Sequence, residues 1–395
     1  MQTRPCWVEI RTRSLEQNYR FLQSLAPLDA ELLTIAKADA YGHSLALCAP
    51  ALVRAGARFL AVTSVEEGVA ARALCPEARI MVLAGIFPGQ AAAVVQHHLT
   101  PVIWEPAQLN DLEAAARSTG LRASGLAVHL EIDTGMSRQG ANIEGLAPLL
   151  GRFEPGSPFK IEGVMTHLYA ADEADGRATQ AQLANLQQAL ATVEAAGLYP
   201  DWLNVGGSAA LLSGTGGDLA ALAARHGMKA MLRPGLSLYG VTPRFDPTFE
   251  SAEPPALAAA RAQLQPVLSW KTAVMSVTTI SPGTVVGYNG TFVATEPMRI
   301  ALVAAGYADG LVRLLGNRFG LLVGGQPAPI VGRVSMDHAV LDVTEIPGVK
   351  PGDEVVILGT QGQQTITAYD HAEATGTIPW EVFTRIGARV PRIAV

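Results

Sequence analysis

The sequence predicts a (β/α)8 barrel followed by a mostly-β domain, and two features of its hydrophobic pattern carry that prediction. Up to about residue 240, short apolar runs alternate about eight times with longer amphipathic stretches, as in parallel strands joined by helices. After residue 267, β-branched residues and closely spaced turn residues indicate an all-β domain. We therefore expect a barrel domain over residues 1–243 and a β domain over residues 244–395, with the boundary in the proline-rich stretch 243–266.

The expected barrel strands are short apolar runs. They are residues 32–36, 59–63, 80–84, 101–104, 126–132, 161–167, 202–205 and 231–239. Periodicity does not count strands around a ring, so an open doubly wound sheet stays an alternative here. No Gly-x-Gly-x-x-Gly follows the first run, which argues against a dinucleotide-binding fold. Between the strands, Ser64 and Glu67 form a capping-box pattern, and residues 177–196 predict a long helix that ends at Gly197.

Composition excludes several classes of partner. The net charge is −6 without a basic stripe, which argues against binding nucleic acid or an anionic membrane. No run of about 18 apolar residues and no signal-peptide pattern occurs, so we expect a cytoplasmic protein. Its three cysteines, Cys6, Cys48 and Cys75, lack any paired spacing and are expected to be free thiols.

Chemically useful side chains follow several expected strands. Lys37 and Arg138 follow expected runs, His167 ends another, Ser208 follows a further one, and Arg233 lies within the last run. Because functional groups of such barrels gather at the carboxyl ends of the strands, we expect these side chains to form one site. A tyrosine, a glycine and a histidine after Lys37 are expected to open a helix.

Five motifs resemble those of bacterial alanine racemases, in the same order along the chain. They are AKADAYGH from Ala36, DTGMSRQG from Asp133, VVGYNGTF from Val285, GYADGLVR from Gly306 and GRVSMDH from Gly332. The resemblance covers essentially the whole chain. It implies a barrel that binds pyridoxal phosphate, a β domain, and a head-to-tail homodimer with two shared active sites.

The resemblance assigns catalysis to two residues. Lys37 matches the lysine that forms a Schiff base with pyridoxal phosphate and exchanges the proton on the D face of the substrate. Tyr288 matches the tyrosine base on the L face, which the family brings in from the partner subunit. Together they imply interconversion of L- and D-alanine, either to supply D-alanine for peptidoglycan or for alanine catabolism.

The remaining expected cofactor contacts also rest on the resemblance. Arg233 matches the arginine that donates to the pyridine nitrogen, and His167 lies in its neighbourhood. Tyr41, Ser208, Gly235 and Leu236 match contacts to the cofactor phosphate. Two departures from the family pattern predict fewer contacts to the cofactor phosphate. Gly207 stands where many members have Asn, and Ala388 stands where some have a tyrosine.

For the substrate, the resemblance points to Arg138, to the backbone N–H of Met336 and to Tyr307 at the entrance. Glu131 stands where many members have a carbamylated lysine beside the arginine. A glutamate already carries the negative charge, so we expect no modification and a role in orienting Arg138. Asp309 and Asp337 lack neighbouring ligands in the sequence, and no metal site is expected.

Alternatives remain at this point. A racemase of the same fold for serine or a larger amino acid is the nearest, because one methylene in a pocket is worth only about 1–3 kcal/mol. Barrel-fold amino-acid decarboxylases would lack YNGTF in this position. A non-catalytic protein that binds pyridoxal phosphate is a third possibility, against which the β domain and Tyr288 argue.

Overall fold

The computed structural model describes residues 4–118, 126–153, 157–173, 176–245 and 254–395. Contacts divide these residues into two compact units. The barrel unit comprises residues 13–40 and 48–265, and the β unit comprises the N-terminal residues up to 12, residues 41–47 and residues 266–395.

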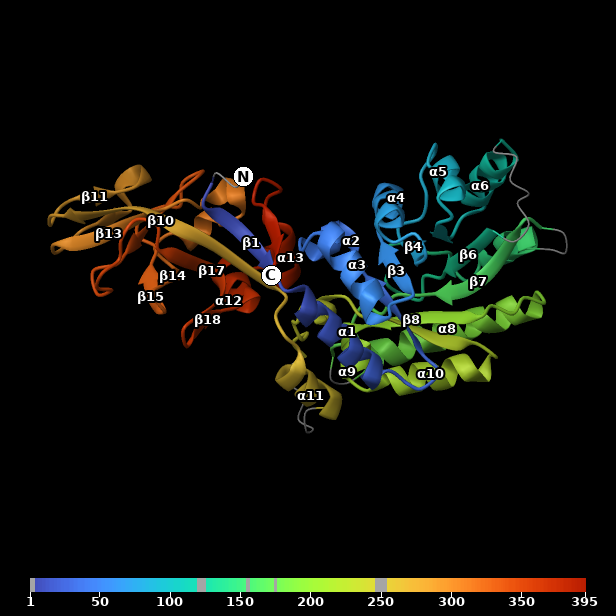
Figure 1. The fold of residues 1–395 in the computed structure, drawn as a ribbon. Coiled ribbons are helices and arrows are strands. Elements are labelled where there is room, and N and C mark those ends of the chain that lie inside the picture. The colour runs from blue at the N-terminus through green and yellow to red at the C-terminus, as the bar shows by residue number, and fades with distance from the viewer. Residues whose placement is uncertain (1–3, 119–125, 154–156, 174–175, 246–253) are drawn as a thin grey trace. The chain divides into compact units, whose positions relative to one another are not determined.

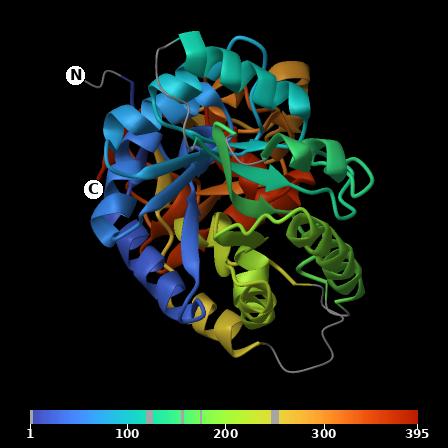
Figure 2. The same ribbon diagram turned by 90° about the vertical axis from the view of Figure 1, so that its right-hand side faces the viewer.

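The barrel unit contains eight parallel strands that close in chain order (Figures 1 and 2). The strands are β2 (Glu31–Ile35), β3 (Phe59–Val62), β4 (Arg79–Val82), β5 (Thr100–Ile103), β6 (Leu126–Glu131), β7 (Phe159–Met165), β8 (Trp202–Gly207) and β9 (Lys229–Arg233). Strand β2 pairs with both β3 and β9, so the ring is closed and the open-sheet alternative is wrong. The predicted barrel is confirmed.

Helices lie around these strands, as Figure 2 shows. The helices are α1 (Thr12–Leu25), α3 (Leu45–Ala55), α4 (Val65–Leu74), α5 (Ala91–Gln96), α6 (Pro106–Ser118), α7 (Leu146–Leu150), α8 (Arg177–Ala195), α9 (Ser208–Leu212), α10 (Thr215–Arg225) and α11 (Pro255–Gln263), with the 3-10 turns η1 (Gly151–Phe153) and η2 (Leu236–Tyr239). The capping box at Ser64 is confirmed, and so is the long helix α8, after which Gly197 adopts a φ of +74°.

Two sequence expectations about local structure were wrong. The last strand ends at Arg233, because Pro234 lacks an N–H for the ladder, and residues 236–239 form η2. Residues 41–43 do not open a helix. Instead Lys37–Tyr41 forms the short element α2, and α3 begins only at Leu45.

The β unit is built on a nine-stranded sheet and a two-stranded ribbon among the described residues. The sheet strands are β1 (Cys6–Ile10), β10 (Leu268–Ile280), β13 (Met298–Val303), β14 (Gly320–Val323), β15 (Gln326–Pro329), β16 (Ala339–Asp342), β17 (Glu354–Gln361), β18 (Gln364–Ile366) and β19 (Arg392–Ala394). The ribbon is β11 (Val285–Val286) with β12 (Phe292–Val293). The mostly-β prediction is confirmed.

The sequence analysis missed β1, which pairs antiparallel with β10 and parallel with β19. The start of the chain therefore belongs to the sheet of the β unit. Two helices, α12 (Ala368–Thr375) and α13 (Pro379–Thr384), and the 3-10 turns η3 (Tyr288–Gly290), η4 (Tyr307–Asp309) and η5 (Arg313–Leu315) complete this unit. Across the described ranges, no helix has both the length and the apolar character needed to span a membrane.

Candidate active site

Lys37 lies directly after β2 and begins a turn of unusual backbone geometry. Ala38, Asp39, Ala40 and Tyr41 all have φ between 53° and 55°, which is the left-handed region. Side chains with a Cβ pay a steric cost in that region, so surrounding contacts must hold the turn. Glu67 is one of them: its Oε1 accepts a hydrogen bond from the Ala38 N–H at 2.7 Å, while its Oε2 accepts from the Thr63 N–H at 2.8 Å.

Cations gather around Lys37. Burial lowers the pKa of its amine, and the positive charges of Arg138 and Arg233 lower it further. The same surroundings lower the pKa of His167 to about 3, first through burial and then through Arg233, Arg138 and Lys37. Lys37, Arg138 and Arg233 thus come from three separate segments and lower the pKa of His167 together. The histidine is neutral at physiological pH.

Arg233 is the most firmly held of these cations. Its side chain is buried, and Nη1 donates to the carbonyl oxygen of Asn204 at 2.6 Å and to Asn204 Oδ1 at 2.5 Å. Nη2 donates to the Thr166 carbonyl at 2.7 Å and lies 3.1 Å from His167 Nδ1. Burial lowers the pKa of Arg233 to about 10, and the negative charge of Glu131 opposes this effect.

Glu131 ends β6 and is buried beside these cations. Its Oε2 accepts a hydrogen bond of 2.5 Å from Gln139 Nε2, which also donates to the Leu83 carbonyl at 3.0 Å. Among the described residues, no hydrogen bond or ion pair joins Glu131 to Arg138, although the Arg138 charge acts on the carboxyl. Burial raises the pKa of Glu131 above its usual range, more than Gln139, Arg233 and Arg138 lower it.

The loop that carries Arg138 is shaped by Asp133. The Asp133 carboxylate accepts hydrogen bonds from the N–H groups of Gly135 at 2.9 Å and Ser137 at 3.0 Å. An aspartate that bonds backbone N–H groups two and four residues ahead fixes a tight turn. The turn accounts for part of the DTGMSRQG pattern that the sequence analysis singled out.

Ser208 lies at the end of β8 and collects backbone amides from the segment after β9. Its Oγ accepts a hydrogen bond from the Gly235 N–H at 3.0 Å and from the Ser237 N–H at 3.3 Å. Convergent amides of this kind also suit a bound anion. The structure thus brings Ser208 beside Gly235 and Leu236, as expected from the sequence.

Four expected site residues belong to the β unit. Tyr41 is buried, and burial raises the pKa of its phenol to about 12, so its hydroxyl keeps a proton to donate. Tyr288, Tyr307 and Met336 are exposed, Tyr288 by 68%. The Tyr307 N–H donates to the Ser335 carbonyl at 2.9 Å, which places the tyrosine turn beside the segment before β16 that carries Met336.

A buried aspartate holds that turn in place. Asp309 accepts hydrogen bonds from Arg4 Nη2 at 2.7 Å, Arg389 Nε at 2.8 Å and the Gly306 N–H at 2.9 Å. Arg389 also bonds Asp337 at 2.7 Å. These contacts give Asp309 and Asp337 structural roles in the β unit.

Sequence reasoning missed two side chains that contact the expected site, Asn204 and Gln139. Asn204 is fully buried and holds Arg233, and Gln139 holds Glu131. A signal was available for Asn204, since a lone amide in the apolar run WLNV requires a buried partner. Gln139 lies in a polar loop motif, where no sequence signal separates it from its neighbours.

Comparison with known proteins gives the family. Residues 10–243 match the alanine racemase N-terminal domain, and residues 267–394 match the alanine racemase C-terminal domain. This chain belongs to the alanine racemase family. It is similar to the alanine racemase of Syntrophobacter fumaroxidans, at 38% identity over 96% of this chain and 95% of the relative.

Solved alanine racemases share the fold. The crystal structure of the enzyme from Streptomyces lavendulae has a TM-score of 0.87 and 31% identity, covering 100% of this chain and 98% of that one. A structure from Bartonella henselae, described with covalently bound pyridoxal phosphate, has a TM-score of 0.81 and 27% identity over 99% of both chains. The family predicted from the motifs is confirmed, and with it the enzyme class, an amino-acid racemase of the alanine racemase type.

Proposed function

We propose that this chain interconverts L- and D-alanine with pyridoxal phosphate, and that Lys37 and Tyr288 are its two proton carriers. Inversion at Cα removes a proton from one face and returns one on the other, so a carrier is needed on each face. The cofactor, when bound, supplies an electron sink for this proton removal. The observation that carries the proposal is the half-buried Lys37 amine of lowered pKa at the end of a barrel strand, near the cations Arg138 and Arg233, in a chain of this family.

The barrel residues fit such a cofactor. A neutral amine is the form that attacks an aldehyde, and the lowered pKa of Lys37 favours that form. The cations Arg138 and Arg233 suit an anionic ligand, and the amides that converge on Ser208 suit its phosphate. We assign Lys37 to the aldehyde carbon and Arg233 to the pyridine nitrogen, with His167 beside it. Ser208, Gly235, Leu236 and Tyr41 are assigned to the phosphate.

The second carrier requires a second copy of the chain. Tyr288 is 68% exposed in its own chain, on a 3-10 turn of the β unit, so its hydroxyl is available to another subunit. We therefore propose a homodimer in which Tyr288 completes the partner's site. Tyr307 and Met336, which are also exposed and lie on neighbouring segments, would accompany it, Tyr307 at the entrance and the Met336 N–H on the substrate carboxylate.

Arg138 is assigned to the substrate carboxylate, because a guanidinium binds a carboxylate with paired hydrogen bonds. Alanine is the proposed substrate, and serine is the competitor to be tested. We place the enzyme in the cytoplasm, since Cys6, Cys48 and Cys75 are buried free thiols. Its product would serve peptidoglycan synthesis or, in the other direction, alanine breakdown.

Proton exchange in D2O tests the substrate. The holoenzyme is incubated with single L- and D-amino acids, and loss of the Cα proton signal is followed by NMR. We expect exchange and racemisation of alanine in both directions, and much slower exchange with serine and basic amino acids. Exchange that is absent with alanine but present with serine would overturn the substrate assignment.

Tyr288→Phe tests the mechanism. The variant should bind pyridoxal phosphate normally, shown by its visible absorbance, while turnover falls by about 100-fold or more, since general acid–base groups typically contribute this much. Tyr199→Phe, at an exposed tyrosine of the barrel unit, is the control and should keep full activity. Full activity of Tyr288→Phe would exclude the tyrosine base. A yellow wild-type protein without any racemase activity would favour a cofactor-binding protein instead.

A further inference from the structure

A line of polar side chains runs from the buried Arg233 to Arg79, whose side chain is exposed. Asn204 Nδ2 lies 3.5 Å from His129 Nδ1, and His129 Nε2 lies 3.7 Å from Glu162 Oε2, which is longer than a hydrogen bond. Arg79 closes the line by bonding both Glu162 oxygens, at 2.8 and 2.5 Å. His129 and Asn204 are fully buried and Glu162 nearly so.

The chemistry of Arg233 fixes the direction of every contact in this line. A guanidinium only donates, so Asn204 must present its Oδ1 to Arg233, as it does at 2.5 Å. The amide Nδ2 of Asn204 then lies 3.5 Å from both Met81 Sδ and His129 Nδ1, and because an amide nitrogen only donates, His129 Nδ1 is the acceptor. The ring proton consequently lies on Nε2, facing the Glu162 carboxylate, and Glu162 only accepts. Nε2 makes no hydrogen bond among the described residues, and the negative charge of the Glu162 carboxylate, 3.7 Å away, favours the proton on that nitrogen.

The backbone is adapted to this line at two places. The pairing of β6 with β7 shifts between Val128 and His129, so that Val128 pairs with Ile161 and His129 with Gly163. The shift leaves Glu162 as an inserted residue, and a bulge of this kind redirects a side chain. Gly163 leaves space for the ring, because an added Cβ there would lie 2.4 Å from His129 Cε1.

We propose that His129 and Glu162 are positioning residues for the racemase reaction, which fix the amide of Asn204 and through it the charge and orientation of Arg233. Arg233 is buried and needs compensating acceptors, which Asn204 supplies with two oxygens. Glu162 holds the His129 tautomer that leaves Nδ1 free to accept. Its carboxylate is ionised at neutral pH, since His129 and Arg79 hold its pKa at about 2 against the effect of burial.

The first test needs neither cofactor nor activity. Histidine-selective ¹⁵N NMR of the full-length apoenzyme reports the tautomer of each ring, and the His129 signals are assigned as those lost in His129→Asn. We expect a neutral ring with the proton on Nε2. A ring protonated on Nδ1, or on both nitrogens, would overturn the proposal, because Asn204 could then not donate to it.

The second test compares variants in the holoenzyme, and it rests on the proposed contact of Arg233 with the cofactor. His129→Leu removes both ring contacts, whereas His129→Asn keeps an acceptor at the position of Nδ1. We expect His129→Leu to lower kcat at least about tenfold and His129→Asn to restore most of the loss, because small displacements of positioned groups are costly. KM for alanine should change by less than about threefold, since Arg233 does not bind the substrate carboxylate.

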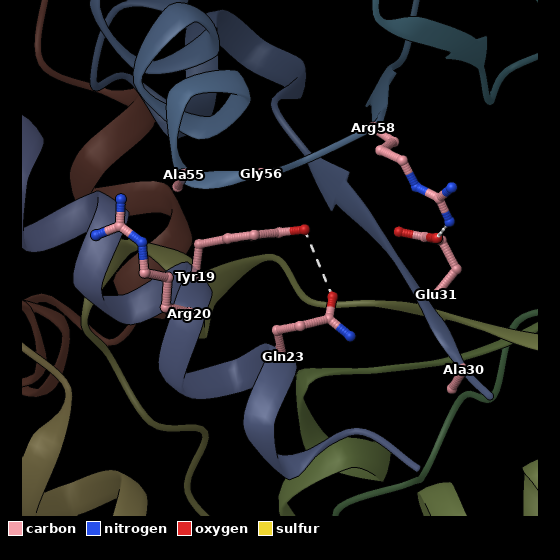
Figure 3. Close-up of a pocket in the computed structure, with 8 residues that line it drawn as sticks. All are labelled: Tyr19, Arg20, Gln23, Ala30, Glu31, Ala55, Gly56 and Arg58. Atoms are coloured by element: carbon pink, nitrogen blue, oxygen red, sulfur yellow. Dashed lines mark hydrogen bonds and ion pairs between the residues drawn. The ribbon is translucent and has the colours of Figure 1, made fainter. Parts of the chain in front are cut away.

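A matched ion pair at the start of another barrel strand supplies the control. Glu31 begins β2, is as buried as Glu162, and bonds Arg58 without contacting His129 (Figure 3). Glu162→Gln should lower kcat and shift the visible absorbance of the bound cofactor, while Glu31→Gln should leave both unchanged. Equal effects of the two substitutions would mean that Glu162 acts only through stability, and would overturn the proposal.

The two tests separate this inference from the proposed function. A protein that shows the Nε2 tautomer but does not racemise alanine would sustain the geometry and overturn the function. An active racemase with an unchanged kcat in His129→Leu would sustain the function and overturn the positioning role. Thermal unfolding of each variant shows whether it folds. If His129→Leu does not fold, the kcat values of His129→Asn and Glu162→Gln decide whether the positioning role holds.

Discussion

Arg233 Nη2 lies 3.1 Å from Nδ1 of His167, and this contact fixes the protonation of the histidine. Arginine has no acceptor, so Nδ1 must accept and the ring must be neutral, with its proton on Nε2. A neutral His167 adds no positive charge to the surroundings of the Lys37 amine. The site thereby keeps the amine reactive.

His167 should therefore remain neutral throughout the working range of pH. Its pKa is lowered to about 3, so the ring signals in histidine NMR should not titrate between pH 5 and 9. Arg233→Gln removes a cation and should raise the pKa of His167 toward its ordinary value. A ring that titrates near pH 6.5 in the wild type would contradict this prediction.

Covalent capture of pyridoxal phosphate by the apoenzyme should extend to unusually low pH. The neutral fraction of Lys37 rises as pH increases through its pKa, and that pKa lies below the ordinary lysine value. The capture rate, followed by absorbance, should therefore reach its plateau at a lower pH than capture by a free amino group of lysine. Arg138→Gln removes one of the responsible cations and should move the plateau upward.

Glu131 should make carbamylation unnecessary. Activity should be independent of added bicarbonate, and mass spectrometry of the peptide with Glu131 should show no added group. In Glu131→Lys a new amine lies beside Gln139, and its activity should rise with bicarbonate if an anion is required there. Glu131→Gln keeps the hydrogen bond to Gln139 but loses the charge, so we expect roughly tenfold lower turnover. Unchanged turnover would exclude a role for the charge.

Shared active sites predict complementation between inactive variants. Lys37→Ala and Tyr288→Phe should each be almost inactive as homodimers. Mixed dimers carry one site with both intact residues, so refolding an equal mixture should recover about a quarter of wild-type activity by random pairing. Differently tagged chains isolate the mixed dimer. No recovery in a confirmed mixed dimer would contradict the shared site.

Gly163→Ala should destabilise the barrel unit. The new Cβ would lie 2.4 Å from Cε1 and 2.5 Å from Nδ1 of a fully buried ring, and overpacking of this kind typically costs about 1–3 kcal/mol. Gly151→Ala is the control, because an added Cβ there meets nothing within 4 Å and the backbone is helical. The free energies of unfolding of the two variants, measured by urea titration, should differ by about this cost.

The sequence reasoning reached the barrel, the β domain and the family because these depend on local patterns. Apolar runs such as FLAV and TPVI are buried throughout as β3 and β5, so their hydrophobicity alone predicted strands. The apolar runs placed Lys37 and Arg138 after strands and His167 at the end of one, whereas Arg233 was expected within a strand that the structure ends at that residue. Chain closure into a barrel followed from the number of such units, although the pattern itself left an open sheet possible.

Only the tertiary structure decided which side chains meet. Strand β1 joins the sheet of the β unit through pairings with residues more than 250 positions away, which no local pattern specifies. The left-handed turn after Lys37 depends on the distant carboxylate of Glu67 rather than on the preference of its own residues. The Glu131 carboxylate accepts a hydrogen bond from Gln139, eight residues further along the chain, a pairing that no pattern in the sequence indicated.

The chemistry at Arg233 shows the same division. From the sequence, an arginine at a strand end could be given a role, because charge and position are local properties. The acceptors of the Arg233 N–H groups are set only by folding, which brings Asn204, Thr166 and His167 to 2.5 to 3.1 Å from them. A guanidinium far from water must satisfy its donors with whatever acceptors surround it, and only closure of the barrel determines those acceptors.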